Sequence, residues 1–265
     1  MKYENKKQIC RVKTFSPVVD YKFKLKKRGR KRQEESPMSK TYYEEAKERR
    51  GETASRRAFE TLRFGDPEAD TVLIQPADGH DLEGIENEVS LIAANCDKSF
   101  CLIAVKVDRW NTDLSPWKAP AVFGKEDFGE GAGETLAKIQ KLCDDGSKNY
   151  YIGGYSLAGL FALWAAYRTD VFKGVAAASP SVWFPGFADF MKENEIRTGA
   201  VYLSLGDREE KARNPVMAAV GDRIREAYAR LAEHGVKCVL EWNEGNHFQD
   251  ADVRTAKAFS WVIKD

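Results

Sequence analysis

The chain has 265 residues, of which 43% are hydrophobic and 31% charged, and its formal net charge is +1. This length and composition exclude a fibrous or wholly disordered protein and favour one large α/β domain over two small ones. No apolar run reaches the ~18 residues of a membrane-spanning helix and no signal peptide is recognisable, so we expect neither membrane insertion nor secretion.

Charge is distributed unevenly along the chain. Residues 1–50 contain 17 Lys and Arg against 7 Asp and Glu, a balance of +10, whereas residues 51–265 contain 25 against 34, a balance of −9. Basic residues are densest at 21–32, where eight of twelve are Lys or Arg. Such a run is typical of an arm that binds nucleic acid or an anionic surface, or of a solvated leader. No nucleic-acid-binding module follows it, so we predict a disordered leader over 1–40 and one domain over 41–265.

The leader allows a second interpretation. Met38 would then be the natural first residue, and residues 1–37 would not belong to the native protein.

The cysteines form no C-x-x-C pair and mostly occupy apolar segments; they are Cys10, Cys96, Cys101, Cys143 and Cys238. We therefore expect reduced and mostly buried thiols, which are usual in the cytoplasm. The cysteine pattern thus predicts a cytoplasmic protein.

The first half of the chain alternates between helix and strand patterns. Composition favours a charged helix over 41–57. Apolar patterns predict strands over 58–64, 70–75 and 100–107, with a periodic helix over 82–95. Residues 109–133 then contain two tryptophans, two prolines and four glycines without a clear period. A loop of that length inside a compact domain is usually functional or mobile.

The second half continues the alternation. Amphipathic or apolar patterns predict helices over 134–144, 157–167, 214–233 and 251–263, and strands over 150–153, 174–178, 200–205 and 236–242. The strands are continuously apolar, which is typical of a mostly parallel sheet covered by helices on both faces. Functional groups on such a sheet gather at the carboxyl ends of its strands.

The segment GYSLAG at 154–159 carries the most specific chemical pattern. It joins a predicted strand to a predicted helix and matches the G-x-S-x-G nucleophile elbow around Ser156, with Ala158 in place of the last Gly and Gly159 one step later. Small residues suit this turn because the serine backbone is strained and the strand packs tightly against the helix. The helix amino terminus beside Ser156 also favours an anion. Because a plain strand-to-helix turn can carry Ser by chance, the assignment needs a base and an acid elsewhere.

A serine hydroxyl is a weak nucleophile until a base accepts its proton, and the chain has three histidines. His247 follows the last predicted strand and precedes the last helix, where an α/β-hydrolase carries its base. His234 stands before Gly235 at the end of the 214–233 helix, where a histidine suits the helix dipole. His80 follows the 70–75 strand and either lines a pocket or is an exposed loop residue. With no further ligands around it, His80 predicts no metal site.

The acid is expected after the 200–205 strand, because the triad of this fold runs in the order Ser, acid, His. Asp207, Glu209 and Glu210 compete for that role. Spacing from the strand end does not choose between them.

Four segments together resemble a family of esterases with the α/β-hydrolase fold: GYSLAG at 154–159, SPSVWF at 179–184, GDRE at 206–209 and GNHF at 245–248. The family includes enterochelin esterases, feruloyl esterases, S-formylglutathione hydrolase and mycolyltransferases, and the similarity spans 58–264. It implies an α/β-hydrolase fold with a mostly parallel central sheet, Ser156 as nucleophile and His247 as base. Enterochelin-type esterases carry G-x-R-E at the acid position, which favours Glu209 over the alternative acid Asp207.

The oxyanion hole is less completely indicated. The chain departs from the family in lacking an H-G-G-type oxyanion loop. We expect the backbone N–H of Leu157, with a second donor from Ala77 or Asp78 in the loop after the 70–75 strand, to stabilise an oxyanion.

Aromatic side chains are candidates for the substrate pocket. Trp183 follows the 174–178 strand and would line the pocket together with His80. Trp110 and Trp117, in the 109–133 stretch, would form a lid. The alternative for each tryptophan is packing against the core.

We therefore predict a serine esterase that cleaves a small-molecule carboxylic ester through an acyl-enzyme, with no cofactor and no metal. We expect neither nucleic acid nor a membrane as partner, and the sequence indicates neither the natural substrate nor the oligomeric state. Two alternatives use the same fold: a catalytically silent binding or scaffold protein, and an acyltransferase that passes the acyl group to an alcohol.

Overall fold

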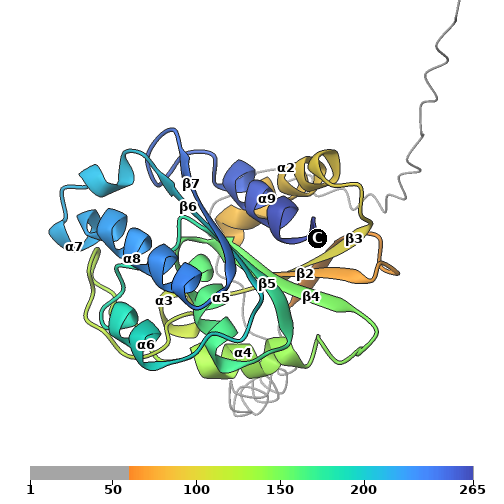
Figure 1. Cartoon of the computed structure of the whole chain (residues 1–265), viewed down its shortest axis with the longest axis horizontal. Helices are drawn as coiled ribbons and strands as arrows, with labels where there is room; N and C mark the ends of the chain where they lie inside the picture. Colours follow the sequence, from red (N-terminus) through yellow and green to blue (C-terminus); the bar gives the residue numbers. More distant parts are fainter. Residues whose placement is uncertain (1–59, 265) are drawn as a thin grey trace, which may run out of the picture. The chain divides into compact units, whose positions relative to one another are not determined.

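A seven-stranded sheet runs through the computed structural model, which describes residues 60–264 (Figure 1). The strand order is β1-β3-β2-β4-β5-β6-β7. The strands are β1 (Thr61–Gly65), β2 (Thr71–Ala77), β3 (Phe100–Lys106), β4 (Asn149–Tyr155), β5 (Phe172–Ala178), β6 (Ala200–Gly206) and β7 (Lys237–Asn243). The leader predicted over 1–40, Cys10 and the helix predicted over 41–57 lie outside the described residues.

The sheet is parallel except at one edge, where β1 pairs with β3 in the antiparallel direction. Along the chain, β3 is added on one side of β2 and β4 on the other, so the strand order reverses between β2 and β4. The crevice outside the carboxyl ends of the strands at such a reversal is the usual place for a site in an open α/β sheet. The predicted mostly parallel sheet is confirmed.

Two layers of helices cover the sheet (Figure 1). Helices α2 and α9 pack together on one face, while α4, α5, α6 and α8 contribute to the larger core on the other. The helices are α2 (Gly79–Asn95), α3 (Trp110–Asp113), α4 (Ala132–Gln140), α5 (Ser156–Arg168), α6 (Phe187–Glu193), α7 (Pro215–Ala218), α8 (Val220–Glu233) and α9 (Ala251–Val262), with a short 3-10 helix η3 (Glu209–Lys211).

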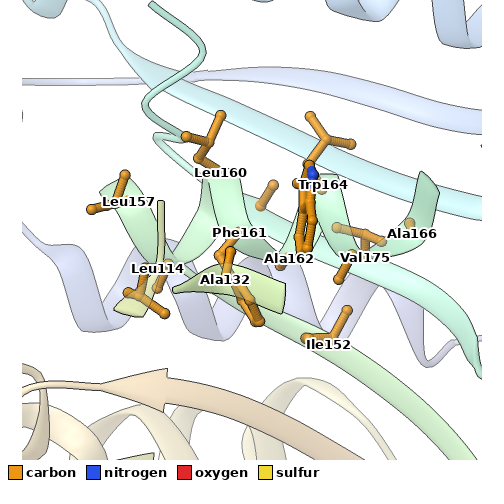
Figure 2. Packing of buried hydrophobic residues seen from close by; sticks show 14 of the residues in the cluster. Leu114, Ala132, Ile152, Leu157, Leu160, Phe161, Ala162, Trp164, Ala166 and Val175 are labelled. Carbon is orange, nitrogen blue, oxygen red and sulfur yellow. The ribbon is translucent and has the colours of Figure 1, made fainter. Parts of the chain in front are cut away.

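Helix α5 lies at the centre of the larger core. Every residue from Leu157 to Tyr167 is buried, and Figure 2 shows Leu160, Phe161 and Trp164 packed among side chains of the sheet and of neighbouring segments. Alanine and leucine favour the helix and need few polar partners, so this sequence can be apolar all round. The residue directly before this run, Ser156, is therefore held by a buried scaffold.

Two predicted elements differ from the structure. A single helix over 214–233 is wrong, because the helix is interrupted at Ala219, between α7 and α8, where φ is −64° and ψ is −9°. Helix α7 is separately capped by the Asn214 side chain, which accepts from the amides of Val216 and Met217. The stretch over 109–133 is also less irregular than predicted, since it contains α3 and an isolated bridge between Ala119 and Phe128.

Two absences apply to the described part of the chain. None of its helices is both long and apolar enough to span a membrane. Its four cysteines are unpaired; Cys101 is buried and Cys96, Cys143 and Cys238 are half-buried, so the expectation of mostly buried thiols is wrong for three of them.

Candidate active site

Ser156 stands on a sharp turn between β4 and α5, with φ of 56°. A non-glycine residue in the left-handed region is strained, and the packed strand and helix on either side hold it there. A Cβ on Gly154 would lie 2.7 Å from the Cβ of Ala158, so alanine fits at 158 because residue 154 has no side chain. A Cβ on Gly159 would lie 3.0 Å from the Gly154 carbonyl oxygen. The two glycines therefore allow the turn to close.

Three side chains form a hydrogen-bonded chain at the carboxyl edge of the sheet. The Ser156 Oγ lies 2.9 Å from His247 Nε2, and His247 Nδ1 lies 2.7 Å from Glu209 Oε2. Ser156 follows β4, Glu209 follows β6 and His247 follows β7, so parallel strands bring together residues up to 91 positions apart. The arrangement is that of a nucleophile, a base and an orienting acid.

The three carboxylates that competed for contact with the histidine have different surroundings. Glu209 is buried, with 4% of its side chain exposed, whereas Asp207 is 53% exposed. Asp207 accepts instead from the Gly245 amide at 2.9 Å and supports the loop that carries His247. Glu210, the third candidate, pairs with Arg225 at 2.9 Å.

The second oxygen of Glu209 is also fully engaged. Its Oε1 accepts from the Gly206 amide at 2.8 Å, from Ser179 Oγ at 2.8 Å and from Arg254 Nη1 at 3.1 Å. A Cβ on Gly206 would lie 3.0 Å from Oε1, so glycine gives the carboxylate room to curl back onto the strand end.

The ionisation of Glu209 follows from these contacts. Burial opposes the charged form most strongly, but the hydrogen bond and charge of His247 and the donors Gly206 and Ser179 outweigh it and hold the pKa of the Glu209 carboxyl below its ordinary value. An ionised carboxylate accepts from the imidazole Nδ1–H, which leaves Nε2 free to accept the serine proton.

Sequence reasoning missed two residues of this network. Arg254, in α9, is 1% exposed and donates to both Tyr155 and Glu209. Ser179 stands at the end of β5 with φ of 42°, a strained position that directs its hydroxyl at Glu209. The sequence held little signal for Arg254, because α9 carries other charged residues, and only its burial shows that this charge needs a partner.

The residues predicted for the oxyanion hole lie at the same edge. Leu157 is in the first turn of α5, where backbone N–H groups lack partners within the helix. Ala77 ends β2, the strand beside β4, and Asp78 caps α2 by accepting from the amides of His80 and Asp81. The Asp78 amide itself donates to Asp81 Oδ2 over 3.3 Å.

A cavity of about 530 Å³ opens beside His247. Trp183 lines it, together with Met217 and Val220, and the exposed Phe248 stands at its border. Basic side chains lie on the same wall; they are Arg208, Lys211 and Arg213. Within the described residues, no group of three or more His, Cys, Asp and Glu is arranged to hold a metal ion.

The other predicted pocket residues lie elsewhere. Trp117 donates from its indole N–H to the Pro185 carbonyl at 2.8 Å and packs against Phe184, while Trp110 packs on the large core. These contacts anchor the 109–133 stretch, and neither tryptophan lines the cavity beside His247. His80 is exposed and lines a separate cavity of about 340 Å³.

No protein-family model matches the chain, and no curated protein matches it either. Several solved structures do match this chain. The siderophore hydrolase EstA from Aspergillus nidulans is 16% identical with a TM-score of 0.53, over 80% of this chain and 96% of that one. An IroE-like serine hydrolase from Shewanella oneidensis is 14% identical with a TM-score of 0.57, over 77% and 79%.

The enterobactin esterase FES from Shigella flexneri is 14% identical with a TM-score of 0.53. The match covers 76% of this chain and 54% of that chain, so it spans about half of the Shigella protein. Identities this low show a shared fold. The fold is that of the α/β serine hydrolases, as the sequence resemblance implied.

Proposed function

We propose that this protein is a serine hydrolase that cleaves a small-molecule carboxylic ester. The observation that carries the proposal is the continuous hydrogen-bonded chain from Ser156 through His247 to Glu209, with distances of 2.9 Å and 2.7 Å. Each residue has the chemistry for its role, and the serine stands on a strained turn at the amino terminus of a buried helix.

The mechanism follows from this geometry. Ser156 Oγ attacks the ester carbonyl while His247 Nε2 accepts its proton. Glu209, held ionised, orients the imidazole and stabilises the imidazolium that forms. The imidazolium then protonates the leaving alcohol, and the acyl group stays on Ser156. A water molecule, deprotonated by His247, releases the acid and restores the serine.

The oxyanion of each tetrahedral intermediate would be stabilised by the Leu157 N–H. A second donor would come from the backbone at Ala77 or Asp78. Loss of one such donor typically costs ~3 kcal/mol of transition-state stabilisation. The Asp78 amide would have to exchange its long bond to Asp81 for the oxyanion, whereas the first turn of α5 offers N–H groups without helical partners.

Three of the solved structures with this fold are called a siderophore hydrolase, an enterobactin esterase and a carboxylesterase. Two of these names, esterase and carboxylesterase, specify an ester bond, and a carboxylic ester is the substrate class that we propose for this chain. A cytoplasmic location is part of the proposal, supported by the four unpaired cysteines of the described residues.

The test is hydrolysis of short p-nitrophenyl esters by the wild type and by Ser156→Ala. We expect the variant to lose at least 10³-fold in kcat, since removal of a triad serine can cost about 10⁶-fold. A fluorophosphonate probe should label the wild type at Ser156 and leave the variant unlabelled. Equal activity of the two proteins would exclude the proposal.

The same assay addresses the other two roles considered for this fold. A folded wild type that neither turns over esters nor reacts with the probe would point to a binding or scaffold protein. Formation of a new ester when an acceptor alcohol is added, in preference to the free acid, would point to an acyltransferase.

A further inference from the structure

A buried guanidinium lies beneath the candidate active site. Arg254 is on α9, on the opposite face of the sheet from α5, and only 1% of it is exposed. Its Nη1 lies 3.0 Å from the Tyr155 hydroxyl, 3.1 Å from Glu209 Oε1 and 3.3 Å from Ser179 Oγ. Its Nη2 donates to the Glu244 carbonyl at 3.0 Å. One side chain thus reaches the ends of β4, β5 and β6 and the start of the histidine loop.

If Arg254 had only a structural role, burying its charge would cost free energy of folding without a compensating gain. Burying a guanidinium requires full pairing, yet Arg254 Nε has no hydrogen-bond partner among the described residues. Replacing a whole buried ion pair by well-packed apolar residues is often neutral for stability, so stability alone does not account for the Arg254–Glu209 pair. The contacts that Arg254 does make all converge on groups that hold the acid or the base, which suggests a role in the chemistry.

The contacts to Glu209 determine how that carboxylate faces the histidine. Oε1 receives three donors, from Gly206, Ser179 and Arg254, and Oε2 is left for His247. A carboxylate held at one oxygen cannot rotate away from the imidazole without breaking those bonds. The orientation of His247 therefore depends on the donors behind Glu209.

A second route runs from Arg254 to the base itself. The Tyr155 hydroxyl accepts from Arg254 and donates to the His247 carbonyl at 2.9 Å, and the Tyr155 ring lies 5.1 Å from the imidazole. Burial, with the charge of Glu209, raises the pKa of Tyr155 to about 12, so this link is a neutral hydroxyl near neutral pH. The acid and the base loop are thus tied to the same guanidinium.

We infer that Arg254 is a positioning residue. Its Nη1 contacts Glu209 and Tyr155, its Nη2 contacts the start of the His247 loop, and together these contacts keep Glu209 and His247 correctly placed relative to each other. The inference rests on the proposed function, in which Glu209 orients His247 and His247 activates Ser156.

Arg254 also supplies positive charge beside the buried carboxylate of Glu209, with its Nη1 3.1 Å from Oε1. The other charged groups around this loop are exposed and screened by solvent; they are Asp207, Arg208, Lys211, Arg213, Glu244 and Asp250. Glu209 and Arg254 are the buried pair, with 4% and 1% of their side chains exposed.

The test compares Arg254→Gln, which removes the charge but keeps a donor, with Arg254→Lys, which keeps the charge but loses the planar guanidinium and its paired N–H groups. Lys257→Gln is the matched control, because Lys257 is on the same helix and pairs at the surface with Glu241. The readouts are kcat and KM for a p-nitrophenyl ester, and the NMR signal of the His247 Nδ1–H that is hydrogen-bonded to Glu209, identified by its absence in His247→Gln.

We expect Arg254→Gln to lower kcat by about 10- to 100-fold with KM changed little, because Glu209 then holds the imidazole less firmly. Arg254→Lys should lower kcat less, since it keeps the charge beside Glu209. Lys257→Gln should match the wild type. The NMR signal of the His247 Nδ1–H should change in Arg254→Gln and stay as in the wild type in Lys257→Gln.

The inference is overturned if folded Arg254→Gln keeps both the wild-type kcat and the wild-type His247 Nδ1–H signal. If Arg254→Gln does not fold, Tyr155→Phe decides, since it removes the link to the His247 carbonyl without removing a charge: reduced kcat at unchanged KM supports the inference, and unchanged kcat overturns it. An inactive wild type whose His247 Nδ1–H signal still changes in Arg254→Gln would count against the proposed function while leaving the positioning role intact.

Discussion

Among the three carboxylates that follow β6, Glu209 is buried and Asp207 is exposed. Glu209 lies against His247 with three further donors on its other oxygen, whereas Asp207 faces solvent and supports the Gly245 amide. The same short segment thus supplies the carboxylate that lies against His247 and the carboxylate that holds the Gly245 amide of the His247 loop.

This difference predicts opposite outcomes for two isosteric changes. Glu209→Gln should lower kcat by about 10³- to 10⁴-fold, because a neutral amide neither stabilises the imidazolium nor fixes the tautomer. Asp207→Asn should stay within about threefold, since its amide oxygen can still accept from Gly245. Steady-state kinetics on one ester measures both, and a larger loss in Asp207→Asn would reverse the assignment of the acid.

Glu88 is a second buried carboxylate, on α2 and outside the triad. Its side chain lies 3.2 Å from the Gln75 amide, and one oxygen of each residue has no partner among the described residues. Burial raises the pKa of the Glu88 carboxyl well above its ordinary value. A carboxyl whose pKa rises on folding makes the protein less stable as pH increases above the ordinary carboxyl pKa.

We therefore expect Glu88→Gln to stabilise the protein by roughly 1–2 kcal/mol at pH 8 and by much less near pH 4.5, where the wild-type carboxyl is protonated in the folded state and about half protonated in the unfolded state. Denaturant unfolding at the two pH values measures the difference. Glu86→Gln, an exposed change on the same helix, is the control. A gain that is equal at both pH values would show that Glu88 is not protonated by burial.

At the scale of elements, the junction of β4 and α5 depends on close backbone approach. A Cβ on Gly153 would lie 2.6 Å from the Ala176 carbonyl oxygen and 2.7 Å from Phe259 Cζ. The neighbouring strand β5 and helix α9 therefore both meet the backbone of β4 where it leads to the serine.

Gly153→Ala should destabilise the protein by about 2–3 kcal/mol, because backbone and ring atoms have to shift to admit the methyl group. Gly133→Ala is the matched change, since Gly133 is exposed in α4 with open space around its Cα, and it should stabilise by about 0.5–1 kcal/mol. Thermal unfolding followed by circular dichroism compares them. Similar effects of the two changes would argue against the tight packing at β4.

At the scale of the whole molecule, every side chain of the proposed mechanism comes from residues 60–264. The sheet, both helix layers and the cavity beside His247 are built from that part of the chain. The domain predicted over 41–265 remains a proposal, as does the leader before it.

Removal of residues 1–40 should accordingly leave kcat/KM within about twofold of the full chain and the unfolding temperature unchanged within error. Ester hydrolysis and thermal unfolding of both proteins provide the measurement. A large loss of activity in a truncated protein that still unfolds cooperatively would assign the basic segment a part in substrate binding.

The sequence by itself determined the local pattern of this protein: continuously apolar strands alternating with helices, small residues around Ser156, and His247 between the last strand and the last helix. These features are readable because strand, turn and helix preferences depend on residues close together in the chain. The fold class followed from their order.

Only the tertiary structure decided which carboxylate lies against His247, and that Arg254 and Ser179 stand behind it. Glu209 is 38 positions from His247 and 45 from Arg254, and Tyr155 is 99 from Arg254. Contacts over such separations depend on strand order and on burial. Sequence spacing does not record them, because parallel strands bring their carboxyl ends together whatever the length of chain between them.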